Sequence, residues 1–228
     1  MIDRTGRKVP PMRSFVLVFV ICGLALAGCG DDDPSPVDPQ PTDPRPTSPT
    51  ALVQQFALAL EHSDFTLYAP LIDPSFVLGL QQATVGDYGL PSPWLTATED
   101  LLATEAAFSG DPAPRSGEVP AAGLAQAQVN LLQQEAAWSF ALPPSPYAGT
   151  TWAPFRIDAD FLDVIGAHTS MRGVLEFYVR PDTTDPGDVR WQLAAMVDLT
   201  ETSKDGVVAN ALAWGDLKAL FRAATAAH

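Results

Sequence analysis

The chain has few of the side chains on which many enzymes and nucleic-acid-binding proteins depend. It contains two cysteines, three histidines, and thirteen lysine or arginine residues against twenty-seven aspartate or glutamate residues. The formal net charge of −14 would repel phosphate backbones and no basic patch offsets it, so we expect no nucleic-acid partner. The phosphate-loop, serine-hydrolase, zinc-protease and paired-cysteine motifs are also missing, so we expect none of these chemistries, no cofactor and no metal site.

Both cysteines lie near an apolar run at the N-terminal end of the chain. The thirteen residues 15–27 are apolar or small and follow four basic residues, and Cys22 lies inside this run. The length fits the core of a secretory signal peptide and falls short of the roughly 20 residues needed to span a bilayer. The run ends in Leu26-Ala27-Gly28-Cys29, which resembles the lipobox of bacterial lipoproteins.

This resemblance implies that the protein is attached to a membrane. Residues 1–28 would be a removable signal peptide, with Met1 or Met12 as its start, and Cys29 would become the lipid attachment site. Acyl chains of the palmitate type hold a protein at a membrane when two or more are present. We therefore expect a lipid-anchored protein of the bacterial cell envelope. Because Gly30 rather than aspartate follows the cysteine, we expect the outer membrane if the bacterium is Gram-negative.

Residues 29–50 are predicted to be the lipidated cysteine and a disordered tether. The stretch 31–50 holds seven prolines, is rich in aspartate and has Val37 as its single large hydrophobic residue. Such a segment cannot bury enough surface to offset the entropy of ordering it, and its prolines favour extended polyproline II. At about 3.1 Å per residue it would reach roughly 60 Å. Residues 51–228 are then predicted to form one domain.

The pattern within this domain predicts helices first and strands afterwards. A cap at Ser48-Pro49 and a capping box at Thr96 and Glu99 begin two of the helices, and Trp94 is expected to pack under the start of the second. The other predicted helices begin at Asp64 and near Trp214. Strands are predicted at residues 76–78, 155–161, 172–179 and 191–199, and at 129–139 as one strand or two. The fold class is therefore α+β.

The order of these elements resembles the nuclear-transport-factor-2-like, or SnoaL-like, superfamily. The resemblance is carried by residues 56–64, the helix that follows Trp94, the strand ending at Asp198 and the short helix at 214–221. It implies a cystatin-like cone, in which a curved antiparallel sheet packs on an N-terminal helical pair plus a further helix. The chain is similar in particular to bacterial lipoproteins of unknown function that carry this cone on a proline-rich tether.

Some members of that superfamily are isomerases or dehydratases with a polar residue inside the cone, and many have no catalysis. Asp198 is the candidate general base here, because an aspartate in an apolar cone gains a raised pKa. Asp198 is expected to share a strand face with Ala194 and Met196. The alternative is that Asp198 ends a strand and binds a backbone amide or an arginine.

Three functions remain open from the sequence. The first is a non-catalytic cone that binds a small apolar ligand or a protein partner, with Trp94, Tyr178 and Met196 as candidate ligand-binding residues. The second is an isomerase or dehydratase that uses Asp198. The third is a structural module that forms a homodimer through an open sheet face.

Overall fold

The computed structural model describes residues 45–110, 123–185, 187–200 and 214–225, and in the last segment it describes side chains up to residue 219. Cys29 and most of the predicted tether lie outside these residues. The folded unit includes residues ahead of 51, since Arg45 pairs with Asp182 and the amide of Trp191 donates to the carbonyl of Pro46 at 2.9 Å. The last residues of the predicted tether therefore belong to the domain.

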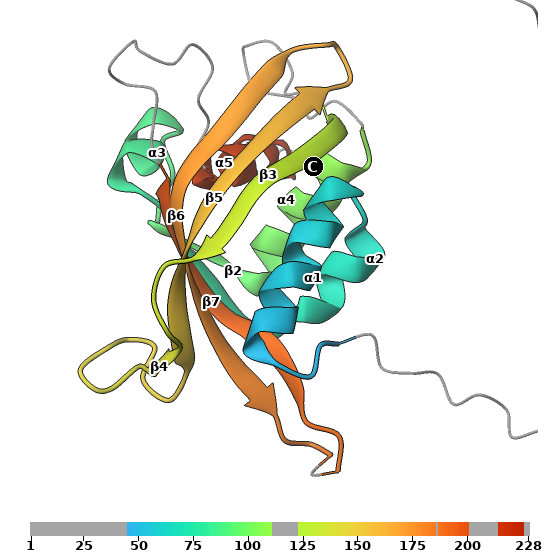
Figure 1. Ribbon diagram of the computed structural model, residues 1–228. Coiled ribbons are helices and arrows are strands. Elements are labelled where there is room, and N and C mark those ends of the chain that lie inside the picture. The colour runs from blue at the N-terminus through green and yellow to red at the C-terminus, as the bar shows by residue number, and fades with distance from the viewer. Residues whose placement is uncertain (1–44, 111–122, 186, 201–213, 226–228) are drawn as a thin grey trace, which may run out of the picture. The chain divides into compact units, whose positions relative to one another are not determined.

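The described residues form an α+β fold around a curved sheet of seven strands (Figure 1). Its strand order is β2-β1-β7-β6-β5-β3, and the short β4 pairs with β5 at the side. The strands are β1 (Ile72–Gly79), β2 (Trp94–Thr96), β3 (Leu124–Gln134), β4 (Ser139–Phe140), β5 (Thr151–Asp163), β6 (His168–Asp182) and β7 (Arg190–Thr200). The predicted alternation of β5 and β6 is confirmed, because Phe155, Ile157, Leu175 and Phe177 are buried.

The sheet is mixed, whereas an antiparallel sheet was predicted. β1 pairs in parallel with β7, and the other paired strands are antiparallel. Hydrophobic alternation marks which residues of a strand are buried but carries no information on the direction of its neighbour. The long connection between β1 and β7 permits either direction.

Local sequence signals begin the two main helices. α1 (Pro49–Glu61) starts after Ser48, whose hydroxyl accepts the Ala51 amide at 3.2 Å, and α4 (Ala97–Phe108) starts with the predicted capping box of Thr96 and Glu99. A cap of this kind stabilises a helix by about 1 kcal/mol. The remaining helices are α2 (Phe65–Tyr68), α3 (Gln82–Asp87) and α5 (Trp214–Thr225).

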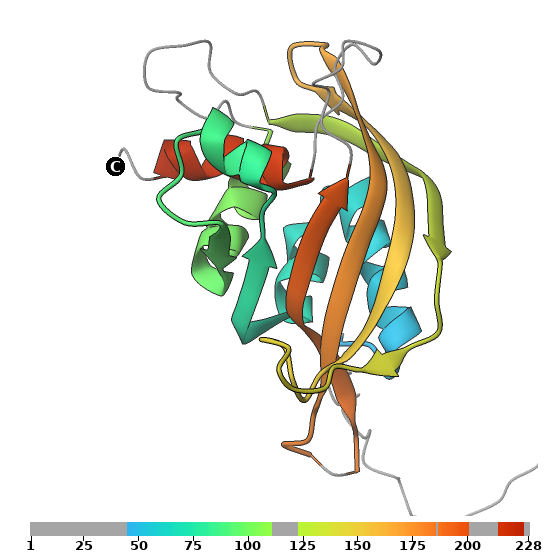
Figure 2. The same cartoon turned by 90° about the vertical axis from the view of Figure 1, so that its left-hand side faces the viewer.

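The helices α1, α2 and α4 lie on one side of the sheet, and the loop that follows β4 lies on the other (Figure 1). We call these sides the inner face and the outer face. On the inner face α1 packs against β3 and β7, while α4 packs against β1 and α5. The view in Figure 2 looks onto the outer face, across which the loop 141–150 runs.

A bulge in β7 changes which residues face inward. Tyr178 pairs with Ala195 and Val179 pairs with Leu193, so Ala194 has no opposite residue on β6. An extra residue of this kind shifts the alternation by one position. Leu193 and Met196 therefore both belong to the inner core, while Ala195 packs on the outer face. The prediction that Ala194 and Met196 share a face was wrong.

Candidate functional site

The inner face of the sheet is filled by large aromatic side chains. Phe56 of α1 lies at the centre, with ring centroids 5.3 Å from Phe177 and 5.7 Å from Trp214. Both contacts are edge-to-face, which is a favoured geometry for aromatic pairs. All three side chains are fully buried. The middle of the predicted cone is thus occupied by protein.

A buried charge pair connects α4 and α5 beside this aromatic cluster. The Lys218 ammonium lies 2.9 Å from Oδ1 of Asp100, and the two side chains are 1% and 0% exposed. Tyr68 donates its hydroxyl to Oδ2 of Asp100 at 2.8 Å, and the Lys218 ammonium also contacts the hydroxyl of Thr104. A buried charge is tolerated when it is paired and hydrogen-bonded in this way.

Burial shifts the ionisation of this group. It lowers the pKa of Lys218, with the Asp100 carboxylate acting in the opposite direction. It also raises the pKa of Tyr68 well above its ordinary value, and here the charge of Asp100 adds to the effect. The Lys218 ammonium also lies 4.7 Å from the ring centroids of Tyr68 and of Trp214, so these contacts hold α5 against α4.

Asp198, the candidate general base, is 1% exposed and fully engaged by hydrogen bonds. Its Oδ1 accepts the amide of Thr200 at 2.9 Å and the Thr200 hydroxyl at 2.5 Å, while Oδ2 accepts the Gly215 amide at 2.5 Å. Burial raises the pKa of the Asp198 carboxyl, and these hydrogen bonds oppose the increase. A carboxylate against the first turn of a helix satisfies amides that have no helical partner. This geometry fits the structural interpretation of Asp198, in which the residue ends a strand and binds a backbone amide, and not its interpretation as a general base.

The sequence around Gly215 makes this contact feasible. A Cβ atom at this position would lie 2.9 Å from Oδ2 of Asp198 and 2.9 Å from Cδ2 of Leu80. Only glycine therefore lets α5 begin so close to β7 and Leu80.

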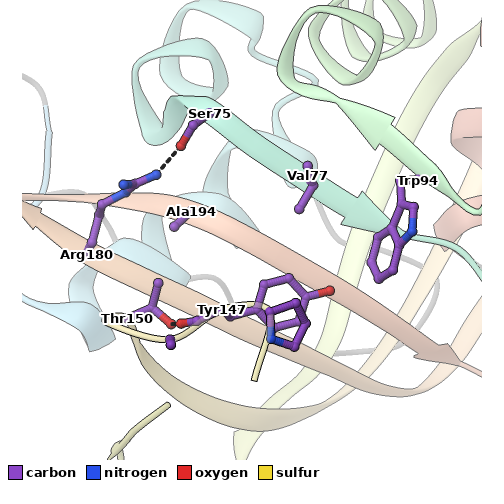
Figure 3. A pocket seen from close by; sticks show the side chains of 9 residues that line it. Ser75, Val77, Trp94, Tyr147, Thr150, Arg180 and Ala194 are labelled. Carbon is purple, nitrogen blue, oxygen red and sulfur yellow. Dashed lines mark hydrogen bonds between the residues drawn. The ribbon is translucent and has the colours of Figure 1, made fainter. Parts of the chain in front are cut away.

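The open site lies on the outer face, in a pocket of about 470 Å³ shown in Figure 3. We call it the outer pocket. Its volume falls in the range of small-molecule sites. Residues of β1, β2, β6 and β7 line one side of the pocket, and residues of the loop 141–150 line the opposite side. The lining residues are Ser75, Val77, Trp94, Pro146, Tyr147, Ala148, Thr150, Arg180 and Ala194.

One end of the outer pocket is aromatic. Trp94 and Tyr147 meet edge to face at 6.3 Å, and Tyr147 lies against Tyr178 with centroids 4.2 Å apart. Tyr178 in turn stacks on Trp152 at 5.7 Å. These four rings form a continuous aromatic row on the outer face. Tyr178 supports Tyr147 from behind and does not line the pocket itself.

Backbone contacts hold Trp94 and Tyr147, the two members of this row that line the outer pocket. A Cβ atom at Gly79 would lie 2.8 Å from Cζ3 of Trp94, so this glycine lets the indole approach β1. The loop that carries Tyr147 is closed by the Ala141 amide on the Thr150 carbonyl at 2.9 Å. The Thr150 hydroxyl also donates to the Tyr147 carbonyl at 2.7 Å. The two rings are positioned before any ligand arrives.

The other end of the outer pocket is polar. Arg180 of β6 reaches Asp73 of β1, with Nε at 2.9 Å from Oδ2 and Nη2 at 2.9 Å from Oδ1. Nη2 also donates to the hydroxyl of Ser75, as Figure 3 shows. Ser75 donates both its amide and its hydroxyl to Oδ1 of Asp73 at 2.7 Å. The guanidinium is therefore fixed in position, and its side chain stays 41% exposed.

The groups that line the outer pocket keep one charge state near neutral pH. Burial, followed by the nearby charge of Glu176, raises the pKa of Tyr147 to about 12. Arginine stays protonated at any pH in the physiological range. Tyr147 and Arg180 are the lining residues with an ionisable side chain, so neither a carboxylate nor an imidazole is among the residues that line the outer pocket.

The candidate ligand-binding residues fall in different places. Trp94 lines the outer pocket and is 42% exposed, so the prediction that it packs under the start of α4 was wrong. Tyr178 lies directly behind the pocket wall, and Met196 is buried in the inner core. Cys29 lies outside the described residues.

Sequence reasoning missed Arg180, Ser75 and Tyr147. Ser75 and Arg180 are 105 residues apart in the chain and meet only through the order of the strands. Tyr147 did carry a signal, since an aromatic residue follows three prolines in residues 143–146. Such a turn is stiff and can present a ring in one orientation.

The described part of the chain holds no cluster of three His, Cys, Asp or Glu side chains able to bind a metal ion. None of the helices described there has both the length and the apolarity required to cross a membrane.

No protein-family model matches the chain, and no curated protein matches it. Solved structures that resemble it include a conserved protein from Planctomyces limnophilus, at 12% identity and a TM-score of 0.47, covering 67% of this chain and 92% of that one. A proposed aromatic ring hydroxylase from Novosphingobium aromaticivorans has 12% identity and a TM-score of 0.45, covering 74% and 92%. AusH from Aspergillus nidulans has 13% identity and a TM-score of 0.41, covering 69% and 88%. Similarities this distant assign no family to the chain.

Proposed function

We propose that the chain is a cell-envelope lipoprotein whose folded domain binds a small, mainly apolar ligand in the outer pocket. The observation that carries the proposal is the construction of this pocket, in which Trp94 and Tyr147 form an apolar end and Arg180 a polar end. Sites for small molecules commonly combine aromatic walls with a few fixed polar groups. The supports of all three side chains are in place without a ligand.

Binding without catalysis is the function that this chemistry favours. An isomerase or dehydratase needs a group that takes up a proton near neutral pH. The pKa of Tyr147 is raised to about 12, and an arginine side chain has no hydrogen-bond acceptor. Asp198 is engaged by Thr200 and Gly215, and it is not one of the residues that line the outer pocket.

We also propose that the domain has the fold of the nuclear-transport-factor-2-like superfamily. Helices on one face of a curved sheet are what the resemblance to the nuclear-transport-factor-2-like superfamily implies, and α1, α2 and α4 lie on the inner face of such a sheet. In this chain the space between sheet and helices is filled by Phe56, Phe177 and Trp214. The proposed ligand site is consequently on the opposite face.

The membrane anchor is tested separately from the ligand. Replacing Cys29 by alanine removes the thiol that would carry the lipid, so we expect the variant to leave the membrane fraction. Replacing Cys22 by alanine is the matched control and should leave the protein in that fraction. A Cys29→Ala protein that still sediments with membranes would contradict the lipoprotein assignment.

The ligand site is tested by titrating acetylnaphthalene into the Cys29→Ala chain and measuring heat of binding. We expect one saturable site, because a bicyclic aromatic ring can lie against Trp94 and Tyr147. Substituting Tyr147 by alanine should weaken this binding about tenfold, which corresponds to about 1.4 kcal/mol. Binding that is absent, or that Tyr147→Ala does not change, would overturn the outer pocket as the site.

A further inference from the structure

The polar end of the outer pocket suggests an anionic ligand at first sight, because it carries an arginine. However, both oxygens of Asp73 already pair with Arg180, through Nε and Nη2 at 2.9 Å each. The contact from Nη2 to Oδ1 is a hydrogen bond, and the contact between Nε and Oδ2 is an ion-pair contact, because Nε has no hydrogen-bond partner among the described residues. The Asp73 side chain is only 13% exposed, so the partner carboxylate is well fixed. The positive charge of Arg180 is therefore neutralised before a ligand binds.

A second carboxylate acts on the aromatic end. Glu176 accepts the Tyr178 hydroxyl at 2.9 Å, and its negative charge contributes to the raised pKa of Tyr147. Asp73 and Glu176 thus place two negative charges near the outer pocket against the single positive charge of Arg180. A ligand carboxylate would be repelled by this balance.

A cationic ligand also fits poorly. An ammonium group only donates hydrogen bonds, and the arginine at the polar end of the outer pocket also only donates. Within the described residues, Nη2 of Arg180 donates to Asp73 and Ser75, and Nε is buried without a hydrogen-bond partner. The hydroxyls of Ser75 and Thr150 already donate to Asp73 and to the Tyr147 carbonyl. The ligand must supply an acceptor.

From this we infer the chemical class of the ligand, an inference that rests on the proposed function: an uncharged, planar aromatic compound with a carbonyl or ether oxygen at one end. Its ring lies against Trp94 and Tyr147, and its oxygen accepts from Arg180. A neutral acceptor uses the available donor without meeting the two carboxylates. The aromatic row supplies the apolar area.

Three probes with the same naphthalene ring and different head groups test this class: acetylnaphthalene, naphthoate and naphthylmethylammonium. Each is titrated into the Cys29→Ala chain. We expect acetylnaphthalene to bind about tenfold or more tightly than either charged probe. If naphthoate or the ammonium binds best, the ligand class is wrong while the outer pocket remains a binding site. If none of the three binds, the proposed function itself fails.

Asp73→Asn sharpens the test by freeing the charge of Arg180. In this variant naphthoate should bind about tenfold more tightly than in the parent, with acetylnaphthalene changed less than about twofold. The matched control is Asp158→Asn, which removes an equal charge from the Arg172 pair at 3.3 Å, away from the outer pocket. A naphthoate affinity that Asp73→Asn leaves unchanged would overturn the inference. The head-group order of the parent chain tests it even if that variant does not fold.

Discussion

On the inner face of the sheet Lys218 and Asp100 pair at 2.9 Å and are almost completely buried, whereas on the outer face Arg180 pairs with Asp73 at 2.9 Å and stays 41% exposed. The two ion pairs have equal lengths, but they differ in what they do in the structure. The inner pair is enclosed by Tyr68, Trp214 and Thr104, so it can only hold helices together. The outer pair borders the outer pocket, and the Arg180 side chain is one of the residues that line it.

This difference shows that an unusual buried charge does not by itself mark a functional site. On the inner face the groups with shifted pKa values are fully buried, and on the outer face the pocket residues are accessible. Structural ion-pair networks shift pKa values too, so a shifted pKa is not specific to catalytic groups. In this protein, accessibility to solvent distinguishes the structural ion pair from the ion pair at the candidate site.

The largest expected effect comes from breaking the inner pair. Asp100→Asn leaves the Lys218 ammonium buried without its counter-charge, and we expect a loss of about 3–5 kcal/mol in the free energy of unfolding. The double variant Asp100→Leu with Lys218→Met removes both charges and should recover most of that loss. Urea unfolding measures both. A double variant as unstable as the single one would show that the pair does more than balance its own charges.

A second effect on stability is expected at Asp198. Asp198→Asn places an amide N–H against the amide of Thr200 or Gly215, and we expect a loss of about 2 kcal/mol in the free energy of unfolding. Binding of acetylnaphthalene should stay within twofold of the parent, that is within about 0.4 kcal/mol. Thermal unfolding and calorimetric titration of one sample give both values. Loss of binding in a folded Asp198→Asn protein would return this residue to the list of functional groups.

On the outer face the expected effect is on affinity. Trp94→Ala removes one wall of the outer pocket, so the affinity for acetylnaphthalene should fall about tenfold, or about 1.4 kcal/mol. The matched control is Trp138→Ala, since Trp138 contacts Phe155 and lies outside the pocket lining. Calorimetry compares the two. Equal losses in both variants would mean that the pocket is not the site of binding.

The smallest expected effect concerns alkaline pH. Because the pKa of Tyr147 is raised from 10.0 to about 12 in the folded chain, the unfolded chain loses this proton first as the pH rises. The free energy of unfolding therefore falls from about pH 10 upward, until the folded form also ionises. Tyr147→Phe should flatten this decline by a few tenths of a kcal/mol, since the ring is partly exposed and screened. Chemical unfolding at several alkaline pH values measures the slope, and an unchanged slope would contradict the assignment.

Much of the fold could be predicted from local patterns. The capping box of Thr96 and Glu99 and the alternation along β5 each depend on neighbouring residues, and the structure has both. The bulge at Ala194 could not be predicted, because residues 193–197 are all apolar and hide an extra residue. The direction of β1 relative to β7 also has no local signal.

The candidate site was harder to predict than the fold. Trp94 was identified, but its partners come from a different strand and from a loop whose position depends on packing against Tyr178. Arg180 looked like one of several polar residues on an alternating strand. Pairing of strands distant in the chain brings such residues together, and single-sequence periodicity does not contain that information.

The most direct test follows the indole N–H signals of Trp94 and Trp214 by nuclear magnetic resonance during a titration with acetylnaphthalene. One tryptophan lines the outer pocket, and the other is fully buried on the inner face. Tryptophan-to-phenylalanine variants assign the two signals. We predict that the Trp94 signal moves and saturates with the ligand while the Trp214 signal stays in place. A Trp214 signal that moves while that of Trp94 does not would place the ligand inside the fold and contradict the account.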